Sequence, residues 1–233
     1  MKIKLFADGA NIDDIKSLYS EGNVRGFTTN PTLMKKAGIK NYLDFALEVL
    51  EVVKDLPVSF EVFSDDFDEM YTQAQTLAAL GDNIYIKIPV TNTKGESSAS
   101  LIRKLDAENI KLNVTAVFTI SQVEEILSNM SGNNSHIISV FAGRIADTGL
   151  DPANIMKEAL GKIKAHSSLL ELLWASPREV LNIYQAEEVG CDIITATPDI
   201  LKKMSLRDKS LEEFSRETVI MFYKDAHSSG YTL

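Results

Sequence analysis

The sequence predicts an α/β protein in which eight parallel strands, each followed by a helix, close into a (β/α)8 TIM barrel with an additional C-terminal helix. Three observations support this prediction. Short apolar segments alternate with segments of helical periodicity, the alternation repeats eight times within about 200 residues, and no linker or low-complexity segment interrupts it. Eight is the number of such units that closes a barrel. We therefore expect residues 1–233 to form a single barrel domain.

The first four units follow from apolar runs and from the residues that start helices. After the first strand, Asn11, Asp13 and Asp14 are typical of a helix start. After the second, Pro31 restricts Asn30 to an extended conformation and ends the strand. We expect strands at residues 2–7, 24–28, 57–63 and 83–91, and helices from residue 11 and over residues 42–53, 65–80 and 98–108.

The last four units repeat this pattern. Ser121 is predicted to cap one helix, and Pro177 to occupy the first turn of another. We expect strands at residues 110–118, 136–141, 169–175 and 190–195, helices at 121–130, 152–165 and 177–188, and a final amphipathic helix at about 210–227. That last helix is more apolar than a solvated tail, so we expect it to pack on the barrel wall or on a neighbouring subunit.

An open, doubly wound sheet is the alternative architecture. The first strand is not followed by a Gly-x-Gly-x-x-Gly motif, and polar residues at strand ends are spread over all units instead of gathering at one switch point. These two observations favour the barrel.

Composition narrows the possible partners. A net charge of −9 argues against nucleic acid or an anionic membrane as a partner. No apolar run approaches the length of a membrane span, and the first residues run directly into a strand without a signal peptide. The single cysteine, Cys191, excludes an internal disulfide and fits a reducing, cytoplasmic setting. The three histidines share no metal-ligand spacing, so no metal site is expected.

Lys87 lies in the middle of the fourth predicted strand. Ile84, Ile86 and Ile88 share one face of that strand, whereas Lys87 lies on the other. Burial disfavours a charged ammonium, and a desolvated lysine amine can act as a nucleophile near neutral pH. An edge-strand lysine that reaches water is an equal alternative from this segment alone.

Polar residues at the C-terminal ends of the strands form the candidate site, because barrel enzymes carry their chemistry there. Asp8, Glu61 and Lys87 would project toward a common centre, which places an amine beside two carboxylates. Two arginines nearby suit a phosphate monoester. The set predicts Schiff-base chemistry on a sugar-like ketone, and it comprises Asp8, Thr28, Asn30, Glu61, Lys87, Asn113, Thr115, Ser139, Phe141, Arg144, Ser176 and Arg178.

Some of these residues also have purely structural interpretations. Asp8 could serve only the start of the first helix. Glu61 could pair with Lys87 as a buried ion pair, although the cost of such pairs favours a functional role. Arg178, expected in the first turn of a helix, could be a solvated surface charge.

Five segments resemble the signature segments of the transaldolase family, in order along most of the chain. They are Gly26-Phe-Thr-Thr-Asn-Pro-Thr-Leu33, Ile86-Lys-Ile-Pro-Val-Thr91, Asn113-Val-Thr115, Phe141-Ala-Gly-Arg-Ile145 and Ala175-Ser-Pro-Arg178. The resemblance implies a class I aldolase-type barrel that acts on sugar phosphates in the pentose phosphate pathway and needs no metal or organic cofactor. It also implies a homo-oligomer, with C-terminal helices exchanged between subunits.

The resemblance also implies a role for each candidate residue. Lys87 would form the Schiff base, and Asp8 would move protons on the donor hydroxyl. Glu61 and Thr115 would hold a proton-relaying water. The remaining residues would bind substrate: Asn30, Asn113 and Ser139 the dihydroxyacetone hydroxyls, Arg144, Ser176 and Arg178 the phosphate, with Thr28 and Phe141 lining the site.

Glu61 and Phe141 resemble the transaldolases of the family, since the related fructose-6-phosphate aldolases carry Gln and Tyr at these positions. The compact length is shared with those aldolases, which release free dihydroxyacetone, and this keeps the aldolase as an alternative. A barrel that binds phosphosugars without turnover is a third interpretation. The joint presence of Asp8, Glu61, Lys87 and Thr115 argues against it.

Overall fold

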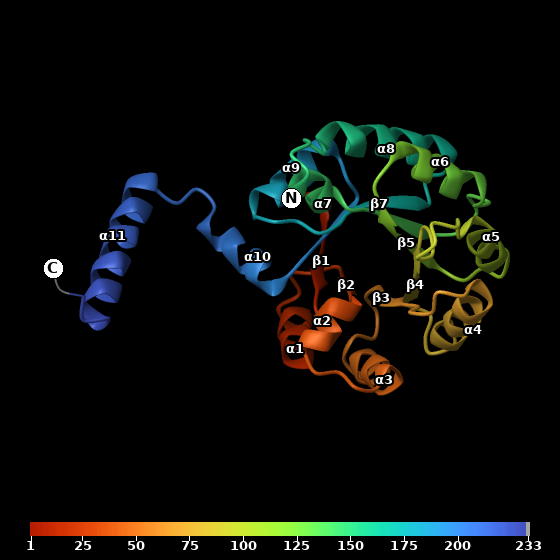
Figure 1. Cartoon of the computed structure of the whole chain (residues 1–233), viewed down its shortest axis with the longest axis horizontal. Coiled ribbons are helices and arrows are strands. Elements are labelled where there is room, and N and C mark those ends of the chain that lie inside the picture. The colour runs from red at the N-terminus through yellow and green to blue at the C-terminus, as the bar shows by residue number, and fades with distance from the viewer. Residues whose placement is uncertain (232–233) are drawn as a thin grey trace. The chain divides into compact units, whose positions relative to one another are not determined.

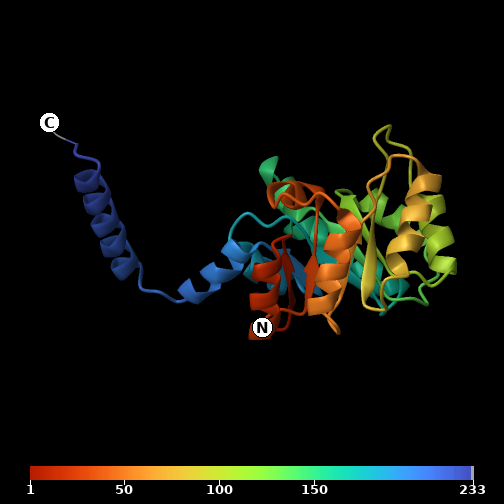
Figure 2. The same ribbon diagram turned by 90° about the horizontal axis from the view of Figure 1, so that it is seen from below.

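The computed structural model describes residues 1–231, in which eight parallel strands form a closed barrel in sequence order. Figure 1 shows helices around the outside of this ring, and Figure 2 shows the same barrel turned by 90°. The strands are β1 (Lys4–Asp8), β2 (Gly26–Thr28), β3 (Val58–Glu61), β4 (Ile84–Pro89), β5 (Leu112–Val117), β6 (His136–Val140), β7 (Leu170–Trp174) and β8 (Ile193–Ala196). The predicted fold class is confirmed, and the doubly wound alternative is wrong because β1 pairs with β8.

Helices connect consecutive strands and continue after the last one. They are α1 (Ile12–Glu21), α2 (Pro31–Lys36), α3 (Tyr42–Val52), α4 (Phe67–Ala78), α5 (Ala99–Ala107), α6 (Ile120–Ser128), α7 (Ala142–Asp147), α8 (Ala153–His166), α9 (Leu181–Val189), α10 (Pro198–Lys202) and α11 (Leu211–Ser228). Two predictions about the boundaries of helices and strands are confirmed. Asn11 caps α1 by accepting from the Asp14 N–H, and Asn30 is extended before Pro31.

Several local details differ from the prediction, among them the bounds of some strands and the short helix α10. The short helices α2 and α7 were not expected, because six residues carry too little periodicity to be recognised. Thr119, not Ser121, caps α6, since it forms a capping box with Gln122. Helix α9 begins at Leu181 instead of residue 177, because the backbone N–H groups of Arg178 and Glu179 are bound by Asn182 Oδ1 in a loop.

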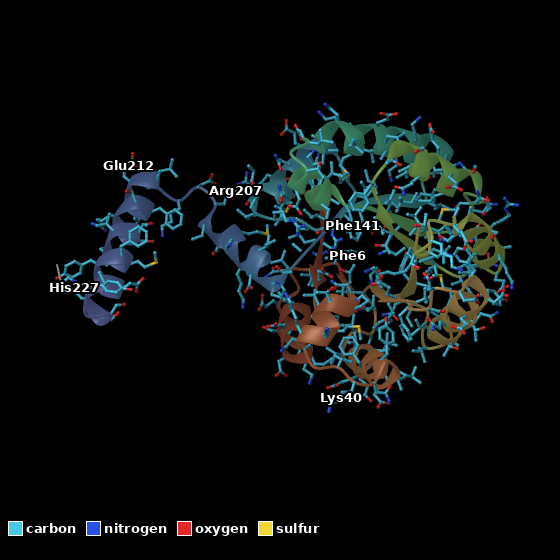
Figure 3. The ribbon with its side chains drawn as sticks, in the orientation of Figure 1. Phe6, Lys40, Phe141, Arg207, Glu212 and His227 are labelled. Carbon is cyan, nitrogen blue, oxygen red and sulfur yellow. The ribbon has the colours of Figure 1, made fainter. Side chains whose placement is uncertain are left out.

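The barrel interior is filled by apolar side chains below the strand ends. Phe6 forms a cluster with Ile137, Leu173, Ala175 and Ile193, against which Phe141 packs. Figure 3 labels Phe6 and Phe141 among the side chains of the barrel. A Cβ at Gly26 would lie 2.5 Å from the Phe6 ring, so glycine there leaves room for this filling. The packed interior closes the barrel beneath the polar residues at its C-terminal end.

The chain divides into two compact units, of which residues 1–201 contain the barrel. The second unit, described to residue 231, contains a short 3₁₀ turn at Lys203–Leu206 and helix α11. Ser210 caps α11 by accepting from the Glu213 N–H at 3.3 Å. Figure 3 labels Glu212 and His227 near the two ends of this helix. The predicted C-terminal helix is therefore confirmed, with bounds within one residue of those expected.

Across residues 1–231, none of the helices combines the length and the apolar character that crossing a membrane requires.

Candidate functional site

A cavity of about 450 Å³ opens at the C-terminal ends of the strands. All of the residues predicted from the sequence line it, namely Asp8, Thr28, Asn30, Glu61, Lys87, Asn113, Thr115, Ser139, Phe141, Arg144, Ser176 and Arg178. A larger hollow of about 630 Å³ near α3 and α4 is lined by mixed side chains such as Leu47, Asp82 and Lys111. It holds none of the predicted residues, so the smaller cavity is the candidate site.

Lys87 is buried on β4, with 7% of its surface exposed. Its Nζ donates to the carbonyl oxygen of Thr29 at 2.7 Å and to Glu61 Oε2 at 3.3 Å. Parallel pairing explains the second contact, since Glu61 lies opposite Lys87 in the β3–β4 register. The alternative of an edge-strand lysine that reaches water is wrong, because β4 is paired on both sides.

Asp8 ends β1 and is bound by neighbouring side chains. Thr28 Oγ1 donates to Asp8 Oδ1 at 2.8 Å, and Asn30 Nδ2 donates to Oδ2 at 3.2 Å. Burial raises the pKa of Asp8, against the opposing effects of the Lys87 charge and of these two hydrogen bonds. A carboxyl group with a raised pKa in a cavity is suited to taking up and returning a proton.

Thr195 on β8 extends this network and was not predicted. Its Oγ1 lies 2.6 Å from Thr28 Oγ1. Since the Thr28 proton goes to Asp8, Thr195 must be the donor in the Thr195–Thr28 contact. The strand-end rule that selected the other residues applies equally to Thr195, which is the last residue of the eighth predicted strand.

Asn113 on β5 is held in one orientation by two serines. Its Nδ2 donates to Ser59 Oγ at 3.0 Å, and its Oδ1 accepts from Ser139 Oγ at 2.6 Å. All three side chains are buried. Ser59 lies on the same face of β3 as Glu61, so the period-2 pattern could have added it to the predicted set.

Thr115 lies beside a break in the β5–β6 ladder. The register shifts between Val114 and Val117, and Ala116 has a left-handed φ of 58°. This conformation costs a residue with a Cβ about 1–2 kcal/mol. A bulge next to a polar cavity re-aims side chains there, and both Thr115 and Ala116 line the cavity.

The two arginines belong to segments that follow β6 and β7, across the ring of strands from Glu61 on β3. Arg144 Cζ lies 5.4 Å from the centre of the Phe141 ring. Arg178 Nε donates to Asp147 Oδ1 at 3.0 Å, and its Nη2 contacts Oδ2. The hydrogen bond and charge of Arg178, with a further contribution from Arg144, lower the pKa of Asp147 against the opposing effect of desolvation. Both arginines line the cavity, as predicted.

Gly143 lets the start of α7 approach the loop that follows β7. A Cβ at this position would lie 1.6 Å from the carbonyl oxygen of Ser176, so any side chain would separate α7 from the loop after β7. Ser176 itself has a left-handed φ of 62°. The close approach brings Ser176, Arg144 and Arg178 to one wall of the cavity.

The cavity therefore combines a buried amine, two carboxylates, hydroxyl and amide groups, and two guanidinium groups. Among residues 1–231, no group of three or more histidine, cysteine or carboxylate side chains has an arrangement that could hold a metal ion. An amine beside a carboxylate can form a Schiff base with a carbonyl compound, and arginines can bind a phosphate.

Known proteins resemble this chain along nearly its full length. Residues 5–232 match the family described as transaldolase/fructose-6-phosphate aldolase. A probable transaldolase from Thermoplasma volcanium is 37% identical over 92% of this chain and 93% of its own. Probable transaldolases from Syntrophobacter fumaroxidans and Methanococcus maripaludis are 33% and 34% identical, over 92% and 91% of this chain and 96% and 95% of their own.

A solved structure from Coccidioides immitis, described as belonging to the dihydrodipicolinate synthase family, has the same fold, with a TM-score of 0.61. At 8% identity the likeness concerns the fold alone, and the alignment covers 84% of this chain but only 66% of the other, just under two thirds. The family match over residues 5–232 and the sequence identities, unlike the fold, identify the family. This chain belongs to the transaldolase/fructose-6-phosphate aldolase family.

Proposed function

We propose that this protein is a transaldolase. It transfers a dihydroxyacetone unit from fructose 6-phosphate or sedoheptulose 7-phosphate to erythrose 4-phosphate or glyceraldehyde 3-phosphate, within the pentose phosphate pathway. The observation that carries the proposal is the buried Lys87 amine, which contacts Glu61 inside a cavity that also contains Asp8. A binding protein gains nothing from a desolvated amine, whereas Schiff-base catalysis needs one.

Imine formation is the first step. Lys87 gives a proton to Glu61, and the amine that results attacks the C2 carbonyl of the ketose. Glu61 then returns this proton, through a water that it holds with Thr115, to the departing oxygen. One water molecule leaves and the imine remains. A carboxylate acting through one water suits this step, because it reaches the oxygen without crowding the carbon skeleton.

Carbon–carbon cleavage follows. Asp8 takes the proton of the C4 hydroxyl, the C3–C4 bond breaks, and its electron pair moves through C3 to the imine nitrogen. The aldose phosphate leaves. Asn30, Asn113 and Ser139 hold the hydroxyls of the remaining three-carbon unit, while Thr28 fixes Asp8.

Transfer to the acceptor aldose phosphate reverses the cleavage step. The C3 carbon attacks the acceptor aldehyde, Asp8 returns its proton to the new hydroxyl, and water hydrolyses the imine to free Lys87. Arg144, Ser176 and Arg178 hold the phosphate of donor and acceptor at one wall of the cavity.

Borohydride reduction tests the Schiff base. With fructose 6-phosphate present, we expect a reduced adduct on the peptide that contains Lys87, and none in the Lys87→Met variant. Lys111, whose amine donates to the Asp82 carbonyl outside this cavity, serves as a matched control, and Lys111→Met should still give the adduct on Lys87. A peptide map in which Lys87 is unmodified would contradict the proposal.

The aldolase that releases dihydroxyacetone is the second candidate, because the family includes both activities. Phe141, whose ring centre lies 5.7 Å from that of Phe118, supports transfer, since it brings no hydroxyl group to the cavity. The Phe141→Tyr variant should gain release of dihydroxyacetone. If it gains none, Phe141 does not separate the two activities.

We also propose a cytoplasmic homo-oligomer of single-domain chains that exchange their C-terminal helices. The free, buried Cys191 supports a reducing compartment. The exposed apolar side chains of α11 support a covered helix, and they are Leu211, Phe214, Val219, Ile220, Met221, Phe222 and Tyr223. Deleting the chain from Ser210 onward should reduce the number of subunits per particle, as measured by light scattering, and an unchanged number of subunits would contradict this assembly.

A further inference from the structure

The first residue of α3, Tyr42, lies behind the Lys87–Glu61 pair and has no part in the mechanism above. We propose that Tyr42 is a positioning residue for Lys87, because its hydroxyl takes the place of the Thr29 carbonyl in the β2–β3 ladder and leaves that carbonyl free for the Lys87 amine. The catalytic consequence rests on the proposed transaldolase activity, but the geometric claim does not.

The β2–β3 ladder shows where the replacement occurs. The Phe27 N–H donates to the Pro57 carbonyl at 2.8 Å, and the Thr29 N–H donates to the Ser59 carbonyl at 3.2 Å. In the evenly spaced pattern of a parallel pair, the next bond would run from the Glu61 N–H to the Thr29 carbonyl.

Both groups of that next bond have other partners. The Glu61 N–H donates to Tyr42 Oη at 2.6 Å, and the Thr29 carbonyl accepts from Lys87 Nζ at 2.7 Å. Since a buried backbone N–H without a partner is costly, Glu61 can forgo the Thr29 carbonyl only because another acceptor is present. Tyr42 is that acceptor.

The Tyr42 hydroxyl is also linked to the other partner of Lys87. The Thr29 side chain lies close enough to influence its pKa, although Thr29 Oγ1 gives its own proton to the Ser59 carbonyl at 3.0 Å. One hydroxyl thus accepts from Glu61 and lies near Thr29, the two residues that accept from Lys87 Nζ in the described chain. Its position constrains where the amine can lie.

Aromatic packing holds the Tyr42 ring in place. Its centre lies 6.3 Å from that of Phe60 and 5.2 Å from that of Phe63, both in edge-on arrangements. Burial raises the pKa of Tyr42, against the opposing effects of the hydrogen bond from the Glu61 N–H and of the nearby Thr29 side chain. The hydroxyl therefore stays neutral at physiological pH and keeps both its proton and its acceptor lone pairs.

The crystal structure of the Tyr42→Phe variant tests the geometric claim without substrate. Phenylalanine keeps the ring contacts and removes only the hydroxyl. We expect the Glu61 N–H to turn to the Thr29 carbonyl and Lys87 Nζ to lose its 2.7 Å contact with that oxygen. A variant in which Thr29 still accepts from Lys87 would overturn the inference.

Kinetics test the consequence. The rate of borohydride-trapped imine formation from fructose 6-phosphate should fall about tenfold in Tyr42→Phe, in line with loss of one hydrogen bond to a charged group. Binding of glucitol 6-phosphate, which has no carbonyl group, should stay within about twofold of the wild type. A purely structural role would instead weaken binding and imine formation together, and that result would overturn the inference.

Tyr19→Phe is the matched control, because its hydroxyl donates to Asp55 Oδ1 at 2.7 Å on the outside of the barrel. It should change neither rate nor binding. A wild-type protein without any adduct would refute the proposed activity and leave the crystallographic test of Tyr42 intact. An adduct formed equally fast in wild type and Tyr42→Phe would refute the positioning role alone.

Discussion

Two buried polar clusters of this barrel differ in what surrounds them. Lys87, Glu61 and Asp8 lie around a cavity at the C-terminal strand ends. Asp106 and His136 form the second cluster, with His136 at the beginning of β6, and neither lines that cavity. The contrast separates a buried charge used for chemistry from one used to join elements of the fold.

The Asp106 cluster satisfies its own polar atoms. Asp106 accepts from His136 Nε2 at 2.7 Å, from the Ser131 N–H at 2.7 Å and from Asn134 Nδ2 at 2.8 Å. His136 Nδ1 accepts from the Leu112 N–H at 3.0 Å, so the neutral ring carries its proton on Nε2. In the Lys87 cluster, by contrast, the amine and carboxylates also face open space where a substrate can react.

Lys87→Met should give the largest effect. Replacing the amine with an apolar chain of similar length removes the nucleophile, so turnover should fall by at least about 10⁴-fold. The melting temperature should fall, because the largely buried Glu61 carboxylate loses the ammonium that it is paired with. Calorimetry and a coupled assay for transfer would measure both. A variant that keeps a tenth of wild-type turnover would break the contrast, since Lys87 would then resemble Asp106.

Asp8→Asn should reduce turnover about 10³-fold, because the amide cannot take the proton of the C4 hydroxyl. The free energy of unfolding of the wild-type protein should also change with pH because of Asp8. Burial raises the pKa of Asp8, so the native protein favours the protonated acid and loses stability as pH rises above the unfolded value of about 4. Asn removes this penalty, and denaturant unfolding at pH 7 should show a more stable variant. A less stable variant would contradict the expected sign.

Asp106→Asn should change the stability in the opposite direction to Asp8→Asn. We expect a loss of about 2–4 kcal/mol in the free energy of unfolding at pH 7, since the amide leaves the Ser131 N–H facing another donor. Turnover per folded molecule should not change. The exposed Asp55→Asn is the matched control and should unfold like the wild type. A large loss of turnover in folded Asp106→Asn would remove the distinction between the clusters.

The pH dependence of this second cluster follows from its pKa shifts. Burial alone would raise the pKa of Asp106, but hydrogen bonds from His136, Ser131 and Asn134 lower it to about 2. Its stabilisation is thus present above the unfolded pKa of about 4 and is lost as pH falls toward 2. Burial lowers the pKa of His136, against the opposing effect of Asp106, so stability also falls as pH drops below about 6.5. Wild-type unfolding should show this acid sensitivity, and Asp106→Asn should show less of it.

Thr195→Val should give the smallest effect. It removes the donor to Thr28 and leaves the Thr28–Asp8 contact less constrained, so turnover should fall about three- to tenfold. Thr72→Val on the outer face of α4 is the control, because its hydroxyl donates only to the Asp68 carbonyl at 3.0 Å among the described contacts. Equal rates in the Thr195 and Thr72 variants would show that the network ends at Thr28.

Strand order explains how much the sequence could predict. The residues at the ends of parallel strands had to meet at one end of a closed barrel, so Asp8, Glu61 and Lys87 could be placed together from the sequence alone. The apolar alternation along β4 left a buried Lys87 and an edge-strand lysine as equal alternatives, and the pairing of β4 on both sides decides for burial. The placement of these three residues follows from the alternation of side chains along each strand and from the order of the strands in the barrel.

Side chains that reach the site from outside the strand ends could not be predicted in this way. Tyr42 comes from α3, and its role depends on where the β2–β3 ladder stops. The loop that holds Arg178 depends on the Asn182 side chain, which moves the start of α9 to Leu181. Such details follow from register and local hydrogen bonding, which a periodic pattern does not encode.

Transaldolase activity is tested most simply by the release of glyceraldehyde 3-phosphate from fructose 6-phosphate, measured with and without erythrose 4-phosphate in one preparation. Transfer requires that the dihydroxyacetone unit stay on Lys87 until an acceptor arrives. We predict sustained release only when erythrose 4-phosphate is present. Comparable release without the acceptor would mean that the imine hydrolyses freely, and it would contradict the transaldolase in favour of an aldolase.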